Sequence, residues 1–208
     1  MEVLDRILNA ATELFRQYGF KTITMDDIAR RAGISKKTLY QQFANKEEVV
    51  EAAMQYFHEH VFEACTGISR TADNAVAAMV QCMSLVDEMC GKMNPLAMLE
   101  LQRFYPRVYS QLQSEMLAET IRLIRQNIEQ GMAEGYYRQG LNADLLAHYR
   151  IATARMLNES ETLMGRKFQH REINQALSEH FLFGLLTAKG ERLYHTYQET
   201  YQQQASEL

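Results

Sequence analysis

Apolar positions recur every three or four residues along almost the whole chain, and no alternating pattern lasts for more than a few residues. This spacing predicts amphipathic helices and no strands. Only two prolines occur among the 208 residues, and Ala, Leu, Met, Glu, Gln and Arg are abundant. We therefore expect an all-α protein, with helices at about residues 4–18, 24–32, 35–43, 46–64, 73–90, 94–104, 106 onward, 117–132, 142–164 and 171–197.

The stretch from Thr24 to Lys46 has the signals of two short helices joined by a tight corner. Thr24 is a suitable N-cap with Asp27 at the third helical position. Gly33 suits a left-handed residue at the corner, and Ser35 can cap the second helix. This order of residues predicts a helix-turn-helix motif.

Lys36 and Lys37 occupy the first turn of the second helix, where the helix dipole is positive and cations are mildly unfavourable. A phosphate partner removes this conflict, so the pair indicates contact with DNA. The alternative is a solvated surface pair. Arg30 and Arg31 lie late in the preceding helix, where the dipole favours cations, so helix stabilisation and phosphate contact are both open.

Charge is distributed unevenly along the chain. The formal net charge is −4, yet residues 21–46 carry six basic and two acidic side chains, a local +4 that leaves −8 for the rest. A basic segment attached to an acidic body is typical of a protein that contacts nucleic acid through one part only.

The remaining composition predicts a cytoplasmic protein that does not enter a membrane. The first residues lack the basic start of a signal peptide, and no run of about 18 apolar residues occurs. Cys65, Cys82 and Cys90 lack the paired spacing of a zinc site or a secreted disulfide framework. We expect buried, reduced thiols, with redox sensing by Cys82 and Cys90 as the alternative.

Neither an enzyme nor a metal site is indicated. Gly131, Gly135 and Gly140 fit no phosphate-binding loop, and no nucleophile motif or cofactor fingerprint occurs. His58 and His60 are two residues apart, which places them on different faces of a helix. We expect no catalysis, no cofactor and no metal ion.

Apolar residues near the C-terminus form a stripe that is wide for a surface helix. Two lines of them lie side by side on the helix expected at 171–197, and further apolar residues lie on the helix expected at 142–164. We expect this surface to be buried against a second copy of the chain. The residues concerned are Leu145, Ala152, Met156, Ile173, Leu177, Phe181, Gly184, Leu185 and Ala188.

The stretch ILNAATELFRQYGFKTITMDDIARRAGISKKTLYQQFANKEEVV resembles the DNA-binding domain of the TetR family of bacterial transcriptional regulators over about 45 residues. The Tyr-Gly-Phe turn, the Gly-Ile-Ser corner and the Thr-Leu-Tyr helix carry the resemblance. Two later phrases, NPLAMLELQRFYPRVYSQL and EQGMAEGYYRQGLNADLLA, are similar to ligand-binding halves of that family. The implied domains are a DNA-binding domain at 1–48 with its motif at about 25–44, a connecting helix at 49–66, and a helical-bundle ligand-binding and dimerisation domain at 67–208.

This resemblance implies a homodimer whose paired recognition helices enter successive major grooves, about 34–36 Å or a multiple of it apart, on a roughly palindromic operator. Carried over position by position, the resemblance implies that the phosphate backbone is contacted by Thr24, Thr38, Tyr40 and Lys46. It places at or beside the base edges Lys36, Lys37, Gln41 and Gln42.

Two departures from the family pattern affect the operator sequence rather than the docking mode. Many relatives have glycine at the position of Lys37, and an aromatic residue followed by histidine at those of Gln41 and Gln42. Lysine favours guanine and glutamine favours adenine, so a mixed half-site is expected.

The resemblance also implies that an effector in the C-terminal half shifts the dimer to a geometry unsuited to DNA. The middle of the chain supplies methionine and aromatic residues, which pack as core as readily as they line a pocket. The candidates for binding an apolar or aromatic effector are Met83, Met98, Phe104, Tyr105, Tyr109, Asn127, His148 and Tyr149. We expect a repressor; the alternative is a DNA-binding regulator with no small-molecule ligand.

Overall fold

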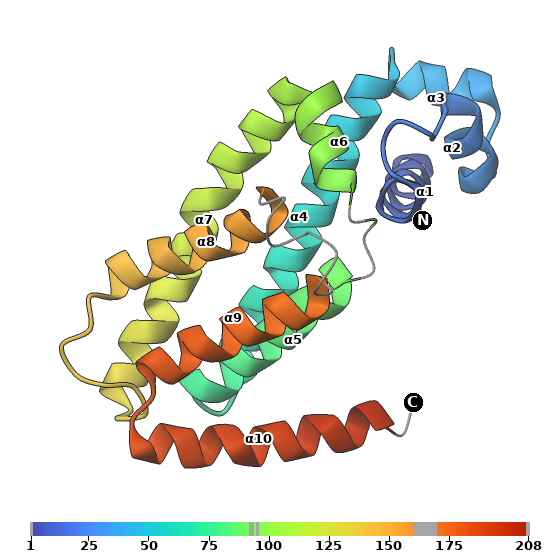
Figure 1. Ribbon diagram of the computed structural model, residues 1–208. Helices are drawn as coiled ribbons and strands as arrows, with labels where there is room; N and C mark the ends of the chain where they lie inside the picture. Colours follow the sequence, from blue (N-terminus) through green and yellow to red (C-terminus); the bar gives the residue numbers. More distant parts are fainter. Residues whose placement is uncertain (1, 92–93, 95, 160–169, 207–208) are drawn as a thin grey trace. The chain divides into compact units, whose positions relative to one another are not determined.

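The computed structural model describes residues 2–91, 94, 96–159 and 170–206. Residues 1–62 and 92–116 form one compact unit, here called the head unit, and residues 63–91 and 117–208 form the body unit. None of the described helices is long and apolar enough to cross a membrane. These helices (Figure 1) are α1 (Val3–Tyr18), α2 (Met25–Ala32), α3 (Lys36–Gln42), α4 (Lys46–Thr71), α5 (Ala75–Gly91), α6 (Ala97–Phe104), α7 (Pro106–Ala133), α8 (Ala143–Glu159), α9 (His170–Leu185) and α10 (Ala188–Ser206).

The first three helices enclose a small apolar core in the head unit. Ile7 and Phe15 of α1, Ile28 of α2 and Leu39 of α3 are fully buried in it, and Phe20 joins them from the α1–α2 turn. Burying one such side chain contributes roughly 1.5–3 kcal/mol. This core holds α2 against α1 and α3 against α2, as the helical spacing predicted.

Local hydrogen bonds begin and end the two short helices as predicted. Thr24 Oγ1 accepts from the Asp27 N–H at 3.2 Å, and the Asp27 carboxylate accepts from the Thr24 N–H at 3.0 Å. Gly33 ends α2 in the left-handed region with φ +65°, and Ser35 Oγ accepts from the Thr38 N–H at 3.0 Å. The predicted helix-turn-helix motif is therefore confirmed.

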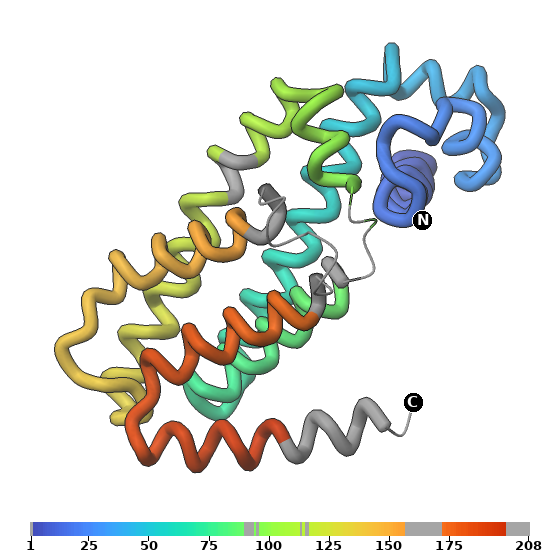
Figure 2. The backbone as a smooth tube through the Cα atoms, viewed as in Figure 1, coloured from blue at the N-terminus to red at the C-terminus, as the bar shows by residue number. Residues whose placement is uncertain are grey.

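The head unit also includes α6 and the start of α7, which the sequence assigned to the C-terminal domain. Ala97 and Leu101 of α6 and Val108 of α7 are buried in the same apolar cluster as α1, α2 and α3. Figure 2 traces the chain as α4 and α7 continue from the head unit into the body unit. The compact units therefore divide the chain differently from the expected boundaries, because a segment distant in sequence completes the head core.

In the body unit, α5 packs against α9 and α10, and α8 packs against α9. The buried Tyr137 hydroxyl lies 3.1 Å from both the Ala75 carbonyl oxygen and Asn127 Oδ1. The Asn127 side-chain amide donates to the same carbonyl at 2.9 Å. Gly131 leaves room for the ring, because a Cβ at this position would lie 2.1 Å from Tyr137. This network fixes the turn after α7 against the start of α5.

The prediction of a single helix at 171–197 is wrong, since the structure has two helices, α9 and α10, in its place. The break follows Leu185, whose carbonyl accepts from the Arg138 N–H, and Thr187 donates its N–H to the Tyr136 carbonyl, each at 2.8 Å. Thr187 Oγ1 then caps α10 by accepting from the Gly190 N–H at 3.2 Å. Tertiary hydrogen bonds thus outweigh the continuous apolar spacing. The end expected near residue 164 for the preceding helix lies outside the described residues.

Candidate nucleic-acid interface

One face of α3 is open to solvent and carries cationic, phenolic and amide side chains. Lys36, Lys37, Tyr40 and Gln41 are exposed, whereas Leu39 is fully buried in the head core. Gln42 at the end of the helix is exposed as well. Residues four apart lie on the same side of a helix, so Lys37 and Gln41 share one edge of this face. The hydrogen-bond donors implied for DNA contact are therefore accessible together.

Lys36 and Lys37 differ in their surroundings. The Lys36 Nζ lies 2.8 Å from Oδ1 of Asp26 on α2, and this hydrogen bond raises the pKa of Lys36 above its ordinary value. No such partner of Lys37 is found within the part of the chain that the structure describes. A DNA phosphate must compete with a carboxylate for Lys36 but not for Lys37. Lys37 is therefore the more available cation.

Two threonines implied for phosphate contact already serve the motif itself. Thr24 Oγ1 caps α2, and it also donates to Asp27 Oδ2 at 2.5 Å. Thr38 Oγ1 lies 2.8 Å from Ser35 Oγ, the cap of α3. Because a hydroxyl can accept and donate at once, these bonds position the threonines without excluding a phosphate.

Lys46 has an internal role that the sequence did not indicate. It is half-buried, and its Nζ donates to the carbonyl oxygen of Phe20. Burial lowers the pKa of Lys46, an effect that the Glu100 and Asp27 carboxylates oppose. The expected phosphate contact of Lys46 therefore has a competing partner, the backbone of the α1–α2 turn.

Glu100 of α6 holds the other side of the same turn. Its Oε2 accepts from the Phe20 N–H at 2.7 Å and from the Lys21 N–H at 3.0 Å. Gly19 provides the space, because a Cβ there would lie 2.6 Å from that oxygen. The turn that leads into α2 is thus fixed by a carboxylate from α6 and an ammonium from α4.

Replacing Glu100 with glutamine is expected to loosen this turn, because the neutral amide accepts hydrogen bonds less strongly than a carboxylate. We expect the free energy of unfolding to fall by roughly 1–2 kcal/mol. Amide hydrogen exchange at Phe20 and Lys21 should accelerate, while Gln102→Ala on the exposed face of α6 should change neither measurement. Unaltered exchange at these two amides would contradict the role of Glu100.

The two arginines of α2 mainly support the head unit. Arg31 pairs with Glu13 of α1 through two hydrogen bonds, one of them from Nε at 3.1 Å, and this pairing raises the pKa of Arg31. Arg30 is more exposed and lies 3.5 Å from Asp27. Of the two alternatives left open by the sequence, helix and head stabilisation is the one that the Arg31 contacts support.

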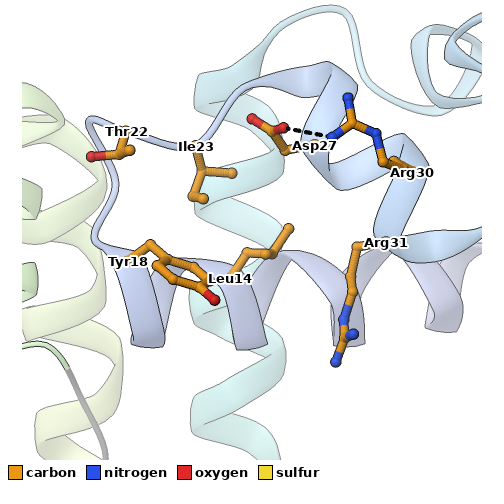
Figure 3. A pocket seen from close by; sticks show the side chains of 7 residues that line it. All are labelled: Leu14, Tyr18, Thr22, Ile23, Asp27, Arg30 and Arg31. Carbon is orange, nitrogen blue, oxygen red and sulfur yellow. Dashed lines mark ion pairs between the residues drawn. The ribbon is translucent and has the colours of Figure 1, made fainter.

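A surface hollow of about 590 Å³ lies beside these arginines on the head unit (Figure 3). Figure 3 shows Leu14 and Tyr18 of α1 below Ile23 and Asp27. The lining residues are Leu14, Tyr18, Thr22, Ile23, Asp27, Arg30 and Arg31. None of them is among the residues predicted to bind an effector.

The residues predicted for the effector pocket are divided between the two units. In the head unit, Met98, Tyr105 and Tyr109 pack against the apolar core, and Phe104 is 44% exposed. The other four predicted residues belong to the body unit. Neither unit by itself therefore contains the expected set.

The four predicted pocket residues of the body unit have different surroundings. Asn127 is buried with both polar atoms hydrogen-bonded, and Met83 packs against the apolar cluster of this unit. His148 and Tyr149 are exposed on α8. Asn127 is thus a packing residue, because its hydrogen-bonding capacity is used within the protein.

The residues predicted for the dimer interface differ widely in their burial. Phe181 and Leu185 are buried in the core of their own body unit, with 4% and 1% of their surface exposed. Leu145 and Met156 of α8 are 62% and 44% exposed. The spacing on α9 identified an apolar face correctly but assigned its most buried members to the wrong neighbour. Ile173 and Leu177 are half-buried, and Ala152, Gly184 and Ala188 are exposed.

The described cysteines are free thiols in the body unit. Cys65 is buried, and the Cys82 thiol lies 3.7 Å from the Cys65 carbonyl oxygen, to which it donates. Hydrogen bonding with Cys65 and burial both raise the pKa of Cys82. The expected reduced state agrees with these positions, and the Cys90 side chain lies outside the described residues.

Residues 7–66 match the profile of a family described as bacterial regulatory proteins, tetR family. These residues belong to the TetR family. The match covers most of α1, all of α2 and α3, and most of α4, and so includes the exposed face of α3. The resemblance noted in the sequence is confirmed.

A curated relative resembles part of this chain in sequence, and two solved structures resemble it in fold. The transcriptional regulator SrpR of Pseudomonas putida is 37% identical over 82 residues, which is 38% of this chain and 38% of that protein. A transcriptional regulator from Cytophaga hutchinsonii has a similar structure, with a TM-score of 0.70, 21% identity, and coverage of 88% of this chain and 98% of that one. A transcriptional regulator from Saccharomonospora viridis, in complex with choline, has a TM-score of 0.69 and 19% identity. The similarity covers 88% of this chain and 97% of that one.

These comparisons confirm the all-α fold with an N-terminal helix-turn-helix and a helical C-terminal part. The chain spans 38% of the length of SrpR, which is less than two thirds of that protein. The matched family and SrpR are described as transcriptional regulators, which agrees with the prediction that the chain is not an enzyme.

Proposed function

We propose that the protein is a cytoplasmic DNA-binding transcriptional regulator, acting as a homodimer that presents two copies of α3 to a palindromic operator. The observation that carries this proposal is the exposed face of α3 within a TetR-family segment. Its cations lie at the helix N-terminus, where the dipole adds to their attraction for phosphate. Lys37, Gln41 and Tyr40 are the first candidates for contact.

Dimerisation is proposed to use the exposed apolar side chains of α8. Leu145, Tyr149, Ala152 and Met156 follow one another at three- and four-residue intervals and are all exposed. Exposed large apolar side chains in a continuous row are typical of an interface. A two-fold axis through such a row gives the paired recognition helices that a palindromic operator needs.

A small-molecule effector is proposed to act through the body unit and to release the protein from its operator, which makes the protein a repressor. The regulator from Saccharomonospora viridis was solved with choline, so a protein of this fold can hold a small ligand. An effector alters DNA affinity only to the extent that it binds one dimer geometry better than another.

Selection of DNA fragments from a random duplex pool by the purified full chain tests the proposal. We expect enrichment of a roughly palindromic sequence, with affinity that falls as salt rises by a log–log slope of about −0.9 per phosphate contacted. The control is the same selection with a chain carrying Lys37→Ala and Gln41→Ala together, which should enrich that sequence poorly. No enrichment by the unaltered chain, or binding insensitive to salt, would exclude the proposed function.

A further inference from the structure

A largely buried guanidinium in the body unit has no counter-charge among the residues whose side chains the structure describes. Arg150 of α8 donates from Nη2 to Oγ of Ser178 on α9 at 2.8 Å, and its Cζ lies 5.8 Å from the centre of the Phe181 ring. Its Nη1 is buried, and no described residue accepts a hydrogen bond from it. The contacts described for the Arg150 side chain are with neutral groups, so neither of these neutralises the positive charge.

The surroundings of Arg150 make this arrangement unfavourable unless an anion is supplied. Burial lowers the pKa of Arg150, with no neighbouring acidic or basic group contributing to the change. A buried cation without an anionic partner costs far more than a paired one, because its lost hydration is not replaced. Groups perturbed in this way gather at functional sites.

We propose that Arg150 and Ser178 form a binding site for the carboxylate of an organic ligand with an apolar body. This inference deepens the proposed function, because such a ligand would be the effector. One guanidinium, with no second cation beside it among the described side chains, matches a single negative charge. An arginine fork also suits the planar carboxylate.

The hydrogen-bonding groups of the site converge on one anion. Ser178 Oγ accepts from Arg150, which leaves the serine proton free to be donated to a carboxylate oxygen. Nη1 of Arg150 can donate to the second oxygen. Protein atoms cover Nη1, so the ligand must displace side chains to reach it.

The apolar character of the ligand follows from Phe181, next to Arg150, and from the apolar cluster to which Phe181 belongs. Phe181 belongs to the apolar cluster of the body unit, and the partly buried Val80 and Met83 pack against that cluster. The Tyr149 ring stacks near Phe181, with centroids 6.4 Å apart. Methionine side chains such as that of Met83 adapt easily to a new neighbour. A monocarboxylate with an apolar body therefore fits this environment better than a polar anion.

Thermal unfolding of the full chain with dodecanoate tests this site, with dodecan-1-ol as the uncharged probe of the same chain length. Saturating dodecanoate should raise the Tm of the unaltered protein by ~5 °C or more. The alcohol should bind at least ~10-fold more weakly, since it cannot pair with the guanidinium. Arg150→Met should remove the response to dodecanoate. Arg192→Met, at an exposed position of the same unit, should leave the response intact.

The Tm of Arg150→Met without any probe gives a second readout. An apolar side chain in place of an unneutralised cation is expected to leave the Tm unchanged or higher. A markedly lower Tm or loss of the dimer would mean that Arg150 is part of the internal framework, and would overturn the proposal. An equal response of Arg150→Met and the unaltered chain to dodecanoate, or no response of either, would overturn it too.

DNA binding separates this inference from the proposed function. Arg150→Met should bind the selected duplex as the unaltered chain does, and dodecanoate should weaken binding only for the unaltered chain. If dodecanoate binds but neither protein binds any duplex, the regulatory function fails while the carboxylate site stands. If the unaltered chain and Arg150→Met both bind the duplex and neither binds dodecanoate, the carboxylate site fails while the regulatory function stands.

Discussion

Replacing Lys37 with alanine is expected to weaken binding of the selected operator by ~10-fold or more while the head unit stays folded. The side chain is exposed and has no described partner, so its removal leaves no unsatisfied group in the protein. A lysine contact to a base edge is worth roughly 1–3 kcal/mol of discrimination, which corresponds to that loss. Lys36→Ala should have a smaller effect, because Asp26 already shares that charge.

Affinity measured at several salt concentrations distinguishes the possible roles of Lys37. If Lys37 contacts phosphate, the salt slope falls by about 0.9 and binding weakens equally on all sequences. If Lys37 reads a base, the selected sequence changes at one position of each half-site. Arg192→Ala removes a positive charge from the body unit and serves as the control. Unchanged affinity and selectivity for Lys37→Ala would remove this residue from the interface.

Replacing Leu185 with aspartate is expected to unfold the body unit rather than merely separate two copies. Leu185 is 1% exposed and packs in the apolar cluster with Phe181, Leu182 and Tyr137. An unpaired buried carboxylate together with the loss of apolar packing costs about 4 kcal/mol or more, a large part of the stability of a typical domain. Calorimetry should show a lost or strongly lowered unfolding transition.

Leu145→Asp is the matched control for this substitution. Leu145 is 62% exposed on α8, so the same chemical change leaves the core of the unit untouched. We expect a folded protein that light scattering reports as a monomer, because the charge lies in the proposed interface. A Leu185→Asp protein with an ordinary transition would mean that the burial of Leu185 is misassigned. A dimeric Leu145→Asp protein would place the interface elsewhere.

Signals within a few residues of each other allowed the motif to be predicted. The Thr24–Asp27 capping box, Gly33 at φ +65° and the Ser35 cap depend on neighbours no more than four residues away. Asn142 is another case, since its Oδ1 accepts from the Leu145 N–H at 3.0 Å as expected for an N-cap. Such interactions depend only on residues that are close together in the sequence, so the helix starts could be predicted.

Contacts between distant segments could not be predicted in this way. Glu100 bonds to the backbone of Phe20, 80 positions earlier, and nothing in the sequence near either residue indicates it. The apolar spacing of α9 marked Leu185 as a buried residue without specifying whether its own unit or a second copy covers it. Arg150 was missed because its environment comes from α9, and a lone arginine on a helix is usually a surface residue.

The head is assembled from two separated pieces of chain, with Leu101 and Val108 filling space among the first three helices. A chimera of two related proteins, joined at a single point after α4, would therefore lack the α6 and α7 side chains that fill the head core. A chimera that keeps the head unit intact must take α6 from the same parent protein as the first three helices. Evolution of a new operator preference is consequently simplest by point changes on α3.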